Sequence, residues 1–292
     1  MSVTAVGVLL NLDGPLPVER QYTLLNFPGV LREQVGEEEP EARWMNGVNV
    51  WGYPDGQPHT WEPCTNGTER AKSSGRGQIL ERFDPFTVYY DLTCSSISIG
   101  DPVEFEARAE RAMNATLAFG IESALANGVA FSTNPYLADS NMVVLASGNP
   151  VSPKVGFGYL EDAIANSTAR QGMIHATPSI ISASGIPGAG FLQETKELYT
   201  PAGTALISGA GYIGAHPVGQ SAPSVPGQGS LSWMFATGPV EIRLGAGPTI
   251  DTITIKEALH RSDNIVTFRA ERYVLCDWDT ALQVGVLVDW SM

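Results

Sequence analysis

The sequence is poor in charged residues, and most of the charge that it carries is negative. Only 16% of its 292 residues are charged, and 17 Lys and Arg stand against 31 Asp and Glu, which gives a net charge of −14. Specific binding to nucleic acid requires clustered cations that displace counterions from phosphates. Adsorption to an anionic membrane also requires clustered cations. Both functions are therefore disfavoured.

Cysteine is scarce, and long apolar runs are absent. The three cysteines Cys64, Cys94 and Cys276 lie far apart and form no CxxC pair, which argues against a disulfide framework and a zinc knuckle. The four histidines show no spacing typical of metal ligands. No apolar run reaches the roughly 18 residues of a membrane span, and the first residues lack the cationic segment of a signal peptide. We expect no membrane segment, metal or cofactor.

Glycine and proline are abundant, with 31 and 20 residues, and turn signals crowd the first hundred positions. Examples are Asp13–Pro15, Phe27–Gly29 and Pro54–Gly56. Only short strand-like pieces lie between these turns. This pattern predicts an extended N-terminal arm over residues 1–45 and a protruding two-stranded loop over residues 46–85.

A long helix is predicted over residues 102–127. Asp101, Pro102 and Glu104 form a helix start, with a capping carboxylate, a proline in the first turn and an acid three residues after the cap. Asn127 and Gly128 form a helix end. Between them, apolar residues recur at every fourth position, namely Phe105, Ala109, Met113, Leu117, Ile121 and Leu125. At about 1.5 Å per residue the helix is roughly 39 Å long.

The rest of the chain is predicted to contain short helices and short strands. Helices are expected after Pro153 and over residues 178–184, and strands over residues 173–176, 204–208 and 240–244. The end of the chain is predicted to be a long hairpin. Its first strand alternates Val266, Phe268 and Ala270 with Thr267, Arg269 and Glu271, and its second strand carries Val284, Val286 and Val288.

One segment matches a dinucleotide-binding motif letter for letter. Residues Gly209–Gly214 read G-x-G-x-x-G directly after a predicted strand and are similar to the opening of sugar-nucleotide epimerases. The motif needs a helix after it, whose N-terminus holds the pyrophosphate. Pro217, Pro223 and Pro226 exclude a helix there, because each interior proline costs about 3 kcal/mol. The segment is interpreted as a glycine-rich turn.

A second candidate site is the pair of carboxylates Asp277 and Asp279, which flank Trp278. In an extended segment the two would share a face and could hold a divalent cation. They lie between the two strands of the predicted final hairpin, where polar turn residues are expected. The turn is the preferred interpretation, and no catalytic, cofactor-binding or metal-binding residue is predicted.

Large aromatic residues are concentrated in the arm, the loop and the strand that follows. A region without its own core must bury such side chains elsewhere, and Trp and Tyr are favoured in protein interfaces. We therefore predict that they contact neighbouring copies of the chain; a carbohydrate-binding platform is the alternative. The candidates are Trp44, Trp51, Trp61, Phe83, Phe86 and Tyr89.

The order of these elements resembles that of tailed-bacteriophage major capsid proteins with the Hong Kong 97-like fold, which is shared with encapsulins. The resemblance implies an α+β fold. Four segments are also similar to stretches of such proteins: Leu160–Ile164, Gly172–Ala176, Gly209–Tyr212 and Trp233–Val240. The resemblance covers almost the whole chain and rests on the order of the elements and on these short, loosely similar segments.

This resemblance implies a division of the chain. The implied parts are the arm at 1–45, the extended loop at 46–85, a peripheral domain at 86–150 with its spine helix at 102–127, an axial domain at 151–230, and return strands, mainly of the peripheral domain, at 231–292.

The resemblance also implies a function. The chain would be a non-enzymatic shell protein that assembles with itself into the hexamers and pentamers of an icosahedral capsid around double-stranded DNA, which it would contact only non-specifically. Portal, scaffold and decoration proteins are the implied further partners. Assembly would take place in the bacterial host cytoplasm. Some relatives crosslink a loop lysine to an asparagine of a neighbour, and Lys72 and Asn264 are the candidates here.

Two alternatives remain open. A nucleotide-sugar or glycan-acting enzyme would be a small particle with a deep pocket lined by titrating groups. Another phage structural protein, such as a decoration or tail-tube subunit, would need no 39 Å helix of the kind estimated above.

Overall fold

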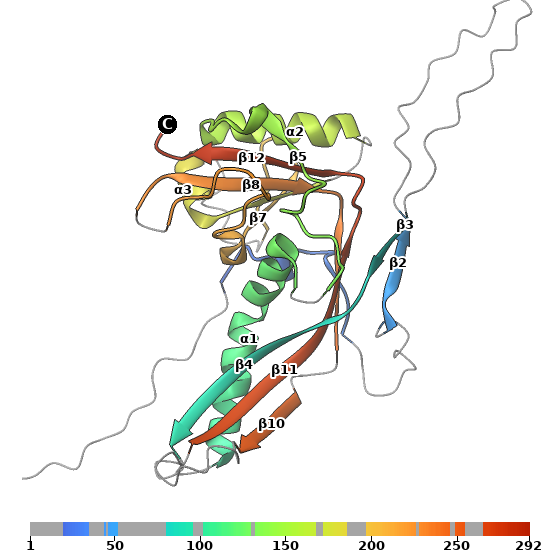
Figure 1. The fold of residues 1–292 in the computed structure, drawn as a ribbon, viewed down its shortest axis with the longest axis vertical. Helices are drawn as coiled ribbons and strands as arrows, with labels where there is room; N and C mark the ends of the chain where they lie inside the picture. Colours follow the sequence, from blue (N-terminus) through green and yellow to red (C-terminus); the bar gives the residue numbers. More distant parts are fainter. Residues whose placement is uncertain are drawn as a thin grey trace, which may run out of the picture.

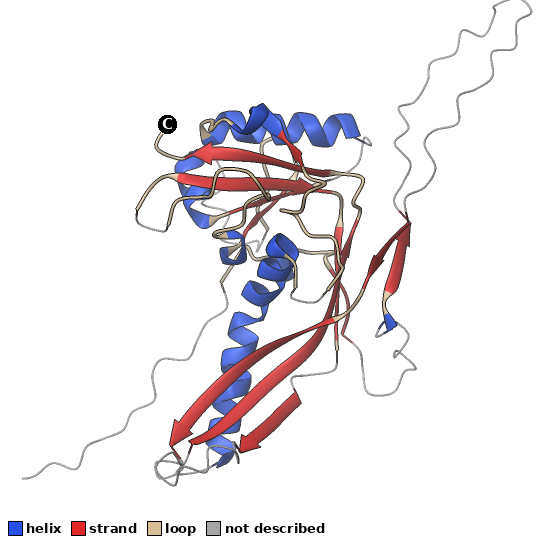
Figure 2. Ribbon diagram, in the orientation of Figure 1, coloured by secondary structure: helices blue, strands red, loops and turns tan. Residues whose placement is uncertain are grey.

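The computed structural model describes residues 20–34, 44, 46–51, 80–95, 102–129, 132–167, 172–185, 197–225, 228–245, 249–254 and 265–292. These residues form an elongated part and a compact part (Figures 1 and 2). The elongated part holds the long helix α1 and the long strands β4 and β11. The compact part holds α2 and α3 against a second sheet. Each part has a five-stranded sheet, which makes the fold a mixed α and β fold, as predicted.

In the elongated part, one sheet is built around β11. This strand pairs antiparallel with β4 along one edge, and with β10 and then β9 along the other. The parallel strand β1 extends the sheet beyond β9. The bounds are β1 (Leu31–Gln34), β4 (Phe86–Ser95), β9 (Val240–Leu244), β10 (Thr249–Thr254) and β11 (Ile265–Trp278).

Helix α1 (Pro102–Asn127) has the predicted bounds and covers one face of this sheet. The predicted apolar positions from Ala109 to Leu125 are buried. Near the helix start, Phe105 stacks on Phe268 of β11 with 5.9 Å between ring centroids. The helix ends where Gly128 takes a left-handed conformation with φ +77°, as the Asn-Gly signal predicts.

In the compact part, the second sheet has the strand order β5-β12-β8-β6-β7. The long helix of this part packs on the sheet through Phe157, Leu160 and Ile164, and these form a second core with Met234 and Val286. The bounds are β5 (Val143–Val144), α2 (Pro153–Ser167), β6 (Met173–Ala176), α3 (Pro178–Ser184), β7 (Ala205–Ser208), β8 (Leu231–Thr237) and β12 (Gln283–Asp289). Strands β6, β7 and β9 and helix α3 confirm the predictions.

The remaining described elements are short. Strands β2 (Val48–Trp51) and β3 (Leu80–Phe83) form a separate antiparallel pair at the base of the predicted loop. Three 3-10 turns complete the list: η1 (Leu24–Asn26), η3 (Leu145–Gly148) and η4 (Ala210–Tyr212).

The prediction of a final hairpin is wrong. Strands β11 and β12 follow each other in sequence but belong to different sheets, because β11 pairs with β4, β9 and β10, whereas β12 pairs with β8 and β5. The pair β9–β11 continues across the boundary as the pair β8–β12. Val240 lies opposite Trp278 on one side, and Thr237 lies opposite Gln283 on the other. The ends of both strand pairs therefore form a two-stranded corner that joins the two parts.

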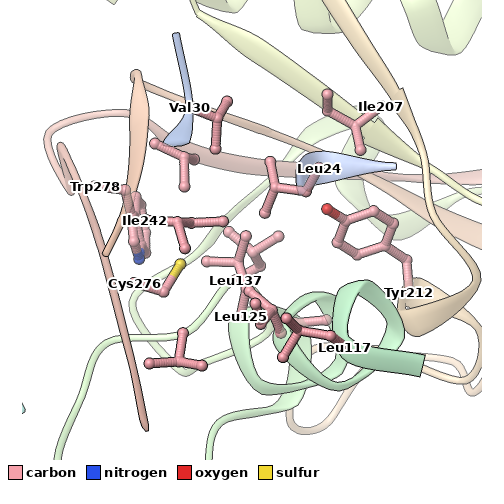
Figure 3. Packing of buried hydrophobic residues seen from close by; sticks show 14 of the residues in the cluster. Leu24, Val30, Leu117, Leu125, Leu137, Ile207, Tyr212, Ile242, Cys276 and Trp278 are labelled. Carbon is pink, nitrogen blue, oxygen red and sulfur yellow. The ribbon is translucent and has the colours of Figure 1, made fainter. Parts of the chain in front are cut away.

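Part of the predicted arm belongs to the chain's own core. Leu24 and Val30 are buried, and Figure 3 shows them beside Leu117 of α1 and Ile242 of β9. The backbone amide of Ser208 donates to the carbonyl oxygen of Tyr22 at 2.9 Å. Residues 20–34 therefore pack against both parts of the same chain. Residues 1–19 lie outside the described residues.

Candidate subunit interface

Where β4 and β11 pair, the sheet of the elongated part has one face that is turned away from α1, and Tyr89 and Tyr273 are exposed on it. Helix α1 lies on the opposite face, where Phe86, Val88, Tyr90 and Leu92 of β4 pack against the core. Side chains alternate along a strand, so the intervening residues of β4 point outward. The residues of β11 that lie opposite them in the register also face outward. The outer face comprises Thr87, Tyr89, Asp91, Thr93, Thr267, Arg269, Glu271 and Tyr273.

Tyr89 and Arg269 form an ordered platform at the centre of the outer face. The guanidinium of Arg269 lies 4.7 Å from the centroid of the Tyr89 ring. The same guanidinium donates to both carboxylate oxygens of Asp91, at 2.7 and 2.9 Å. This hydrogen bonding, more than the charge of Arg269, holds the pKa of Asp91 below its ordinary value. Because the three side chains hold one another in place, little side-chain entropy remains to be lost on binding.

The exposure of this face fits a protein contact. Tyr89 is 59% exposed and Tyr273 is 42% exposed. Exposed Tyr beside Arg is the side-chain composition that dominates binding energy in protein interfaces. The sequence singled out Tyr89 but not Arg269 or Tyr273. Their alternation on β11 was visible, but the pairing with β4 that joins them to Tyr89 was not.

The other aromatic candidates fall into two groups. Trp44 and Phe83 are buried within this chain, and Phe86 is half-buried against the same core. Phe83 packs edge-on against Trp278 at 6.5 Å between centroids. For these three residues a contact with a neighbouring copy stays a prediction. Trp51 is the last residue of β2 and lies opposite Leu80 of β3. Trp61, Lys72 and Asn264 lie outside the described residues.

The segment Gly209–Gly214 is a turn, as the prolines after it predict. It forms η4, and residues 215–225, which follow it, contain no helix. The turn packs against Glu122 of α1, and the amide of Gly211 donates to Oε2 of that carboxylate at 3.1 Å. A Cβ atom on Gly211 would lie 2.5 Å from the backbone nitrogen of Ser123. The glycines therefore serve close packing on α1, not the approach of a pyrophosphate.

Glu122 is a buried carboxylate with partners on two distant segments. Its Oε1 atom accepts from the amide of Leu24 at 3.1 Å, and its Oε2 atom accepts from Gly211. Burial raises the pKa of Glu122, although both amides and the nearby Arg20 act in the opposite direction. The group joins residues 20–34, α1 and η4, and neither its sequence neighbours nor any spacing signalled this role.

His175 is a buried core residue, and both of its ring nitrogens have hydrogen-bond partners. Its Nδ1 lies 2.9 Å from the Tyr212 hydroxyl and its Nε2 lies 2.9 Å from Oγ1 of Thr237. Thr237 donates its own hydroxyl hydrogen to the carbonyl of Gly238 at 2.8 Å, so we infer that Nε2 donates and that Nδ1 accepts. Burial lowers the pKa of His175 to about 3. A histidine that stays neutral in this way is a poor general acid at neutral pH.

Of the two carboxylates that flank Trp278, only Asp279 lies at a turn, where it accepts from the amide of Ala281 at 3.1 Å. Asp277 and Trp278 are buried residues of β11, and only Asp279 lies beyond the strand. Arg243 of β9 forms an ion pair with Asp277 and a second one with Glu241 at 3.1 Å. The prediction that Asp277 and Trp278 belong to a hairpin turn is therefore wrong, because the strand runs through both residues into the corner.

A polar cavity of about 560 Å³ lies beside this corner. Gln283 lines this cavity, and its side-chain amide donates to the carbonyl oxygen of Tyr136 and to Oδ1 of Asp139, both at 2.8 Å. Asn134, also in the wall, accepts from the amide of Asp84 and donates to the carbonyl oxygen of the same residue, both at 2.7 Å. The contacts of Asn134 hold the chain between β3 and β4 in place. None of the contacts named here joins a nucleophile to a base.

Within the described ranges, no group of three or more His, Cys, Asp or Glu side chains is arranged to hold a metal ion. Among the same residues, no helix is both apolar enough and long enough to cross a bilayer.

Comparisons with known proteins were made on sequence and on structure. No protein-family model matches the sequence. No curated protein matches it either. Solved structures do match, over nearly the whole chain. A chain in the structure of the phage G gp27 major capsid proteins and gp26 decoration proteins has a TM-score of 0.53 at 11% identity, and the match covers 99% of each chain.

Two further phage structures agree. A chain from Gordonia phage Cozz has a TM-score of 0.52 at 13% identity, with 98% of this chain and 91% of that chain covered. A chain from Mycobacterium phage Bobi has a TM-score of 0.51 at 10% identity, with coverage of 98% and 96%. The chain has the fold of a phage capsid protein. The predicted resemblance is confirmed at the level of the fold, and the full coverage shows that this capsid fold includes both parts of the chain.

Proposed function

We propose that the chain is the major capsid protein of a tailed bacteriophage and assembles with itself into the hexamers and pentamers of an icosahedral shell around double-stranded DNA. The observation that carries this proposal is the match to the phage G structure, which covers 99% of both chains. A structural role needs no catalytic group, and the segment that most resembled a cofactor site is filled by Glu122.

The domain division of the Hong Kong 97-like fold is part of this proposal. Helix α1 would be the spine helix of a peripheral domain at 86–150, and α2 would belong to an axial domain at 151–230. Residues 1–45 and 46–85 would be the arm and the extended loop. The strands after residue 231 supply both sheets, with β8 and β12 in the compact part and β9 to β11 in the elongated part.

Subunit contacts would use the outer face of the elongated part. Tyr89 and Tyr273 are exposed there beside the ordered Arg269. Trp44, Trp51, Trp61, Phe83 and Phe86 remain proposed contact residues. Portal, scaffold and decoration proteins are proposed as further partners. The negative net charge suits a shell whose lining does not hold packaged phosphates.

Expression of the full chain followed by electron microscopy tests the proposal. We expect closed shells of megadalton mass, and the double variant Tyr89→Ala/Tyr273→Ala should reduce their yield. A matched control is Val155→Ala, which removes an exposed apolar side chain from α2. Small soluble particles alone, under all assembly conditions, would contradict a capsid role and favour the enzyme alternative.

The proposed crosslink between Lys72 and Asn264 has its own test. Shells dissolved in hot detergent would give a ladder of covalent oligomers on a denaturing gel. The variants Lys72→Arg and Asn264→Ala would each remove the ladder without preventing assembly. A single monomer band from intact shells of the original chain would exclude the crosslink and leave the capsid proposal unaffected.

A further inference from the structure

Strand β4 has one edge that no described strand covers. All ten of its residues pair with β11 along the other edge, from Phe86 opposite Val274 to Ser95 opposite Ile265. Unpaired edges of this length are templates for pairing with another chain, and native proteins usually protect them with Lys, Pro or a bulge. Between Phe86 and Ser95 there is no Lys or Pro, the register is unbroken, and Asp91 is the single charged residue.

The direction of the backbone groups on this edge follows from one hydrogen bond. The amide of Gly245 donates to the carbonyl oxygen of Tyr273 at 2.9 Å, so the polar groups of Tyr273 point away from β4. These groups alternate along a strand, and residues directly opposite each other in an antiparallel pair point the same way relative to the ladder. Thr87 lies opposite Tyr273. The amides and carbonyls of Thr87, Tyr89, Asp91 and Thr93 therefore point out along the open edge.

In the second sheet, the edge formed by β7 is covered by other segments of the same chain. Strand β7 has only four residues, but two segments cover its outer edge: the amide of Leu206 donates to the carbonyl oxygen of Leu198 at 2.8 Å, and the amide of Ser208 donates to that of Tyr22 at 2.9 Å. A short edge is thus protected within the chain, while an edge of ten residues is left open among the described residues.

The opposite edge of the same sheet offers a matching strand. Strand β10 pairs with β11 on the side away from β4, with Asp251 opposite Arg269 and Thr252 opposite Phe268. By the same alternation, the backbone groups of Ile250, Thr252 and Thr254 point out along that second edge. A contact between the β4 edge of one copy and the β10 edge of the next is heterologous and repeats from copy to copy, as ring-shaped assemblies require.

Charge also favours a second copy as the occupant of the edge. Each copy carries a net charge of −14, so two copies approach best where that charge is locally absent. On β4 the single acid, Asp91, is neutralised by the two hydrogen bonds from Arg269. We propose that, in the assembled form, the open edge of β4 pairs with β10 of a second copy of this chain. This inference rests on the proposed self-assembly.

The proposed contact between β4 and β10 is small, and its size determines in which state of the protein it forms. A strand pair of about six residues buries far less than the roughly 800 Å² per partner of a stable interface. We therefore expect it in the assembled shell, where neighbouring contacts raise the effective concentration of the partner strand, and not between free subunits.

Amide hydrogen exchange, read at single residues, tests the pairing on assembled shells and unassembled subunits of the full chain. Exchange at Thr87, Tyr89, Asp91 and Thr93 should slow at least about tenfold on assembly, whereas Val88, Tyr90 and Leu92, already bonded to β11, should change little. Ile250, Thr252 and Thr254 should slow together with the β4 residues. If shells form but the β4 edge exchanges as fast in them as in free subunits, the proposed strand pairing is wrong and the proposed function is unaffected. Protection on β4 without β10 would overturn β10 as the partner, and the absence of any shell would overturn the proposed function as well.

A substitution gives a second, independent readout. Proline at position 93 removes an outward-pointing amide and no hydrogen bond of the β4–β11 ladder, which an edge strand tolerates. Thr93→Pro should leave the unassembled subunit folded but slow shell formation at least about tenfold. Thr93→Val, which keeps the amide and loses the same 3.2 Å contact with the Thr267 hydroxyl, should assemble at the original rate. Equal assembly of the two variants would contradict the proposal. If Thr93→Pro does not fold, the exchange experiment on the original chain decides the question.

Discussion

The carboxylate of Glu122 accepts a hydrogen bond of 3.1 Å from the amide of Leu24, a residue 98 positions earlier in the chain. Its other oxygen accepts from Gly211 at the same distance. One side chain of α1 therefore holds the segment that enters the core and the turn that follows β7.

Replacement of Glu122 should destabilise the subunit through its two partners. Glu122→Ala leaves two buried amides without acceptors and should lower the free energy of unfolding by more than about 2 kcal/mol, whereas Glu122→Gln keeps one acceptor and should cost about 1 kcal/mol. Urea unfolding of the unassembled subunit measures both losses. If the two variants are equally stable, the hydrogen bond that the glutamine variant retains contributes nothing to stability.

The same residue should give the subunit a specific pH dependence. Burial raises the pKa of Glu122 above its ordinary value of 4.5, so the folded state takes up a proton at a higher pH than the unfolded chain. The contribution of this group to stability therefore rises as the pH falls from neutral towards 4.5. The difference in stability between the original chain and Glu122→Gln should grow over that range, as unfolding at a series of pH values would show.

His175 should act in the opposite direction. Its pKa falls from 6.5 to about 3 in the folded state because the ring is buried. Its contribution to stability is complete above pH 6.5 and is lost as the pH falls from there towards 3, because only the unfolded chain takes up the proton. In His175→Phe the loss of stability over this range should be smaller. At pH 7 that variant should be about 2 kcal/mol less stable, because Tyr212 and Thr237 each lose a partner.

The glycine of the motif-like turn should not tolerate a side chain. A Cβ atom on Gly211 would lie 2.5 Å from the Ser123 nitrogen and 2.7 Å from the Phe119 carbonyl oxygen, and neither backbone atom can move without shifting α1. Gly211→Ala should lower the thermal midpoint by more than about 5 °C, if the clash costs 2 kcal/mol or more. Gly158→Ala, on the exposed side of α2 with nothing within 4 Å, should leave the midpoint unchanged or raise it. A tolerated Gly211→Ala would show that the turn is not packed on α1 as described.

Asn134 should control the bend between β3 and β4. Its side-chain amide satisfies both the amide and the carbonyl of Asp84. Asn134→Ala should cost about 1 to 3 kcal/mol, because both backbone groups lose a partner. Asn134→Asp can accept from the amide but cannot donate to the carbonyl, so it should recover part of the loss. Faster exchange of the Asp84 amide in the alanine variant would report the effect locally.

Local signals predicted the helices well. The bounds of α1 followed from Asp101-Pro102 and Asn127-Gly128, because capping and backbone conformation act within a few residues. Strand partners depend on residues far away. Nothing near residues 279–282 distinguishes a hairpin turn from a passage between sheets, and this is why β11 and β12 were wrongly paired.

The candidate interface shows the same limit. The alternation along β11 placed Arg269 on the strand face opposite Phe268, but its stacking on Tyr89 depends on a pairing across about 180 residues. Nothing in the sequence around Glu122 indicated that its side chain is buried, because a charged residue in an amphipathic helix is normally expected on the solvent side. The proline-rich stretch after Gly214, by contrast, was sufficient to predict a turn at this segment, because backbone chemistry forbids the helix that a dinucleotide motif needs there.

The corner between the two sheets has a mechanical consequence. The paths through 238–239 and 279–282 bend side by side, and a Cβ atom on Gly238 would lie 2.7 Å from that of Asp279. The sheets also share packing, because the core that holds α1 against the first sheet includes Met173, Ile207 and Phe235 of the second sheet. The corner is the place where the backbone itself passes from one sheet to the other. Gly238→Ala should therefore change the angle between the sheets, and with it the curvature of any particle built from this chain, more than the strand pairing within either sheet.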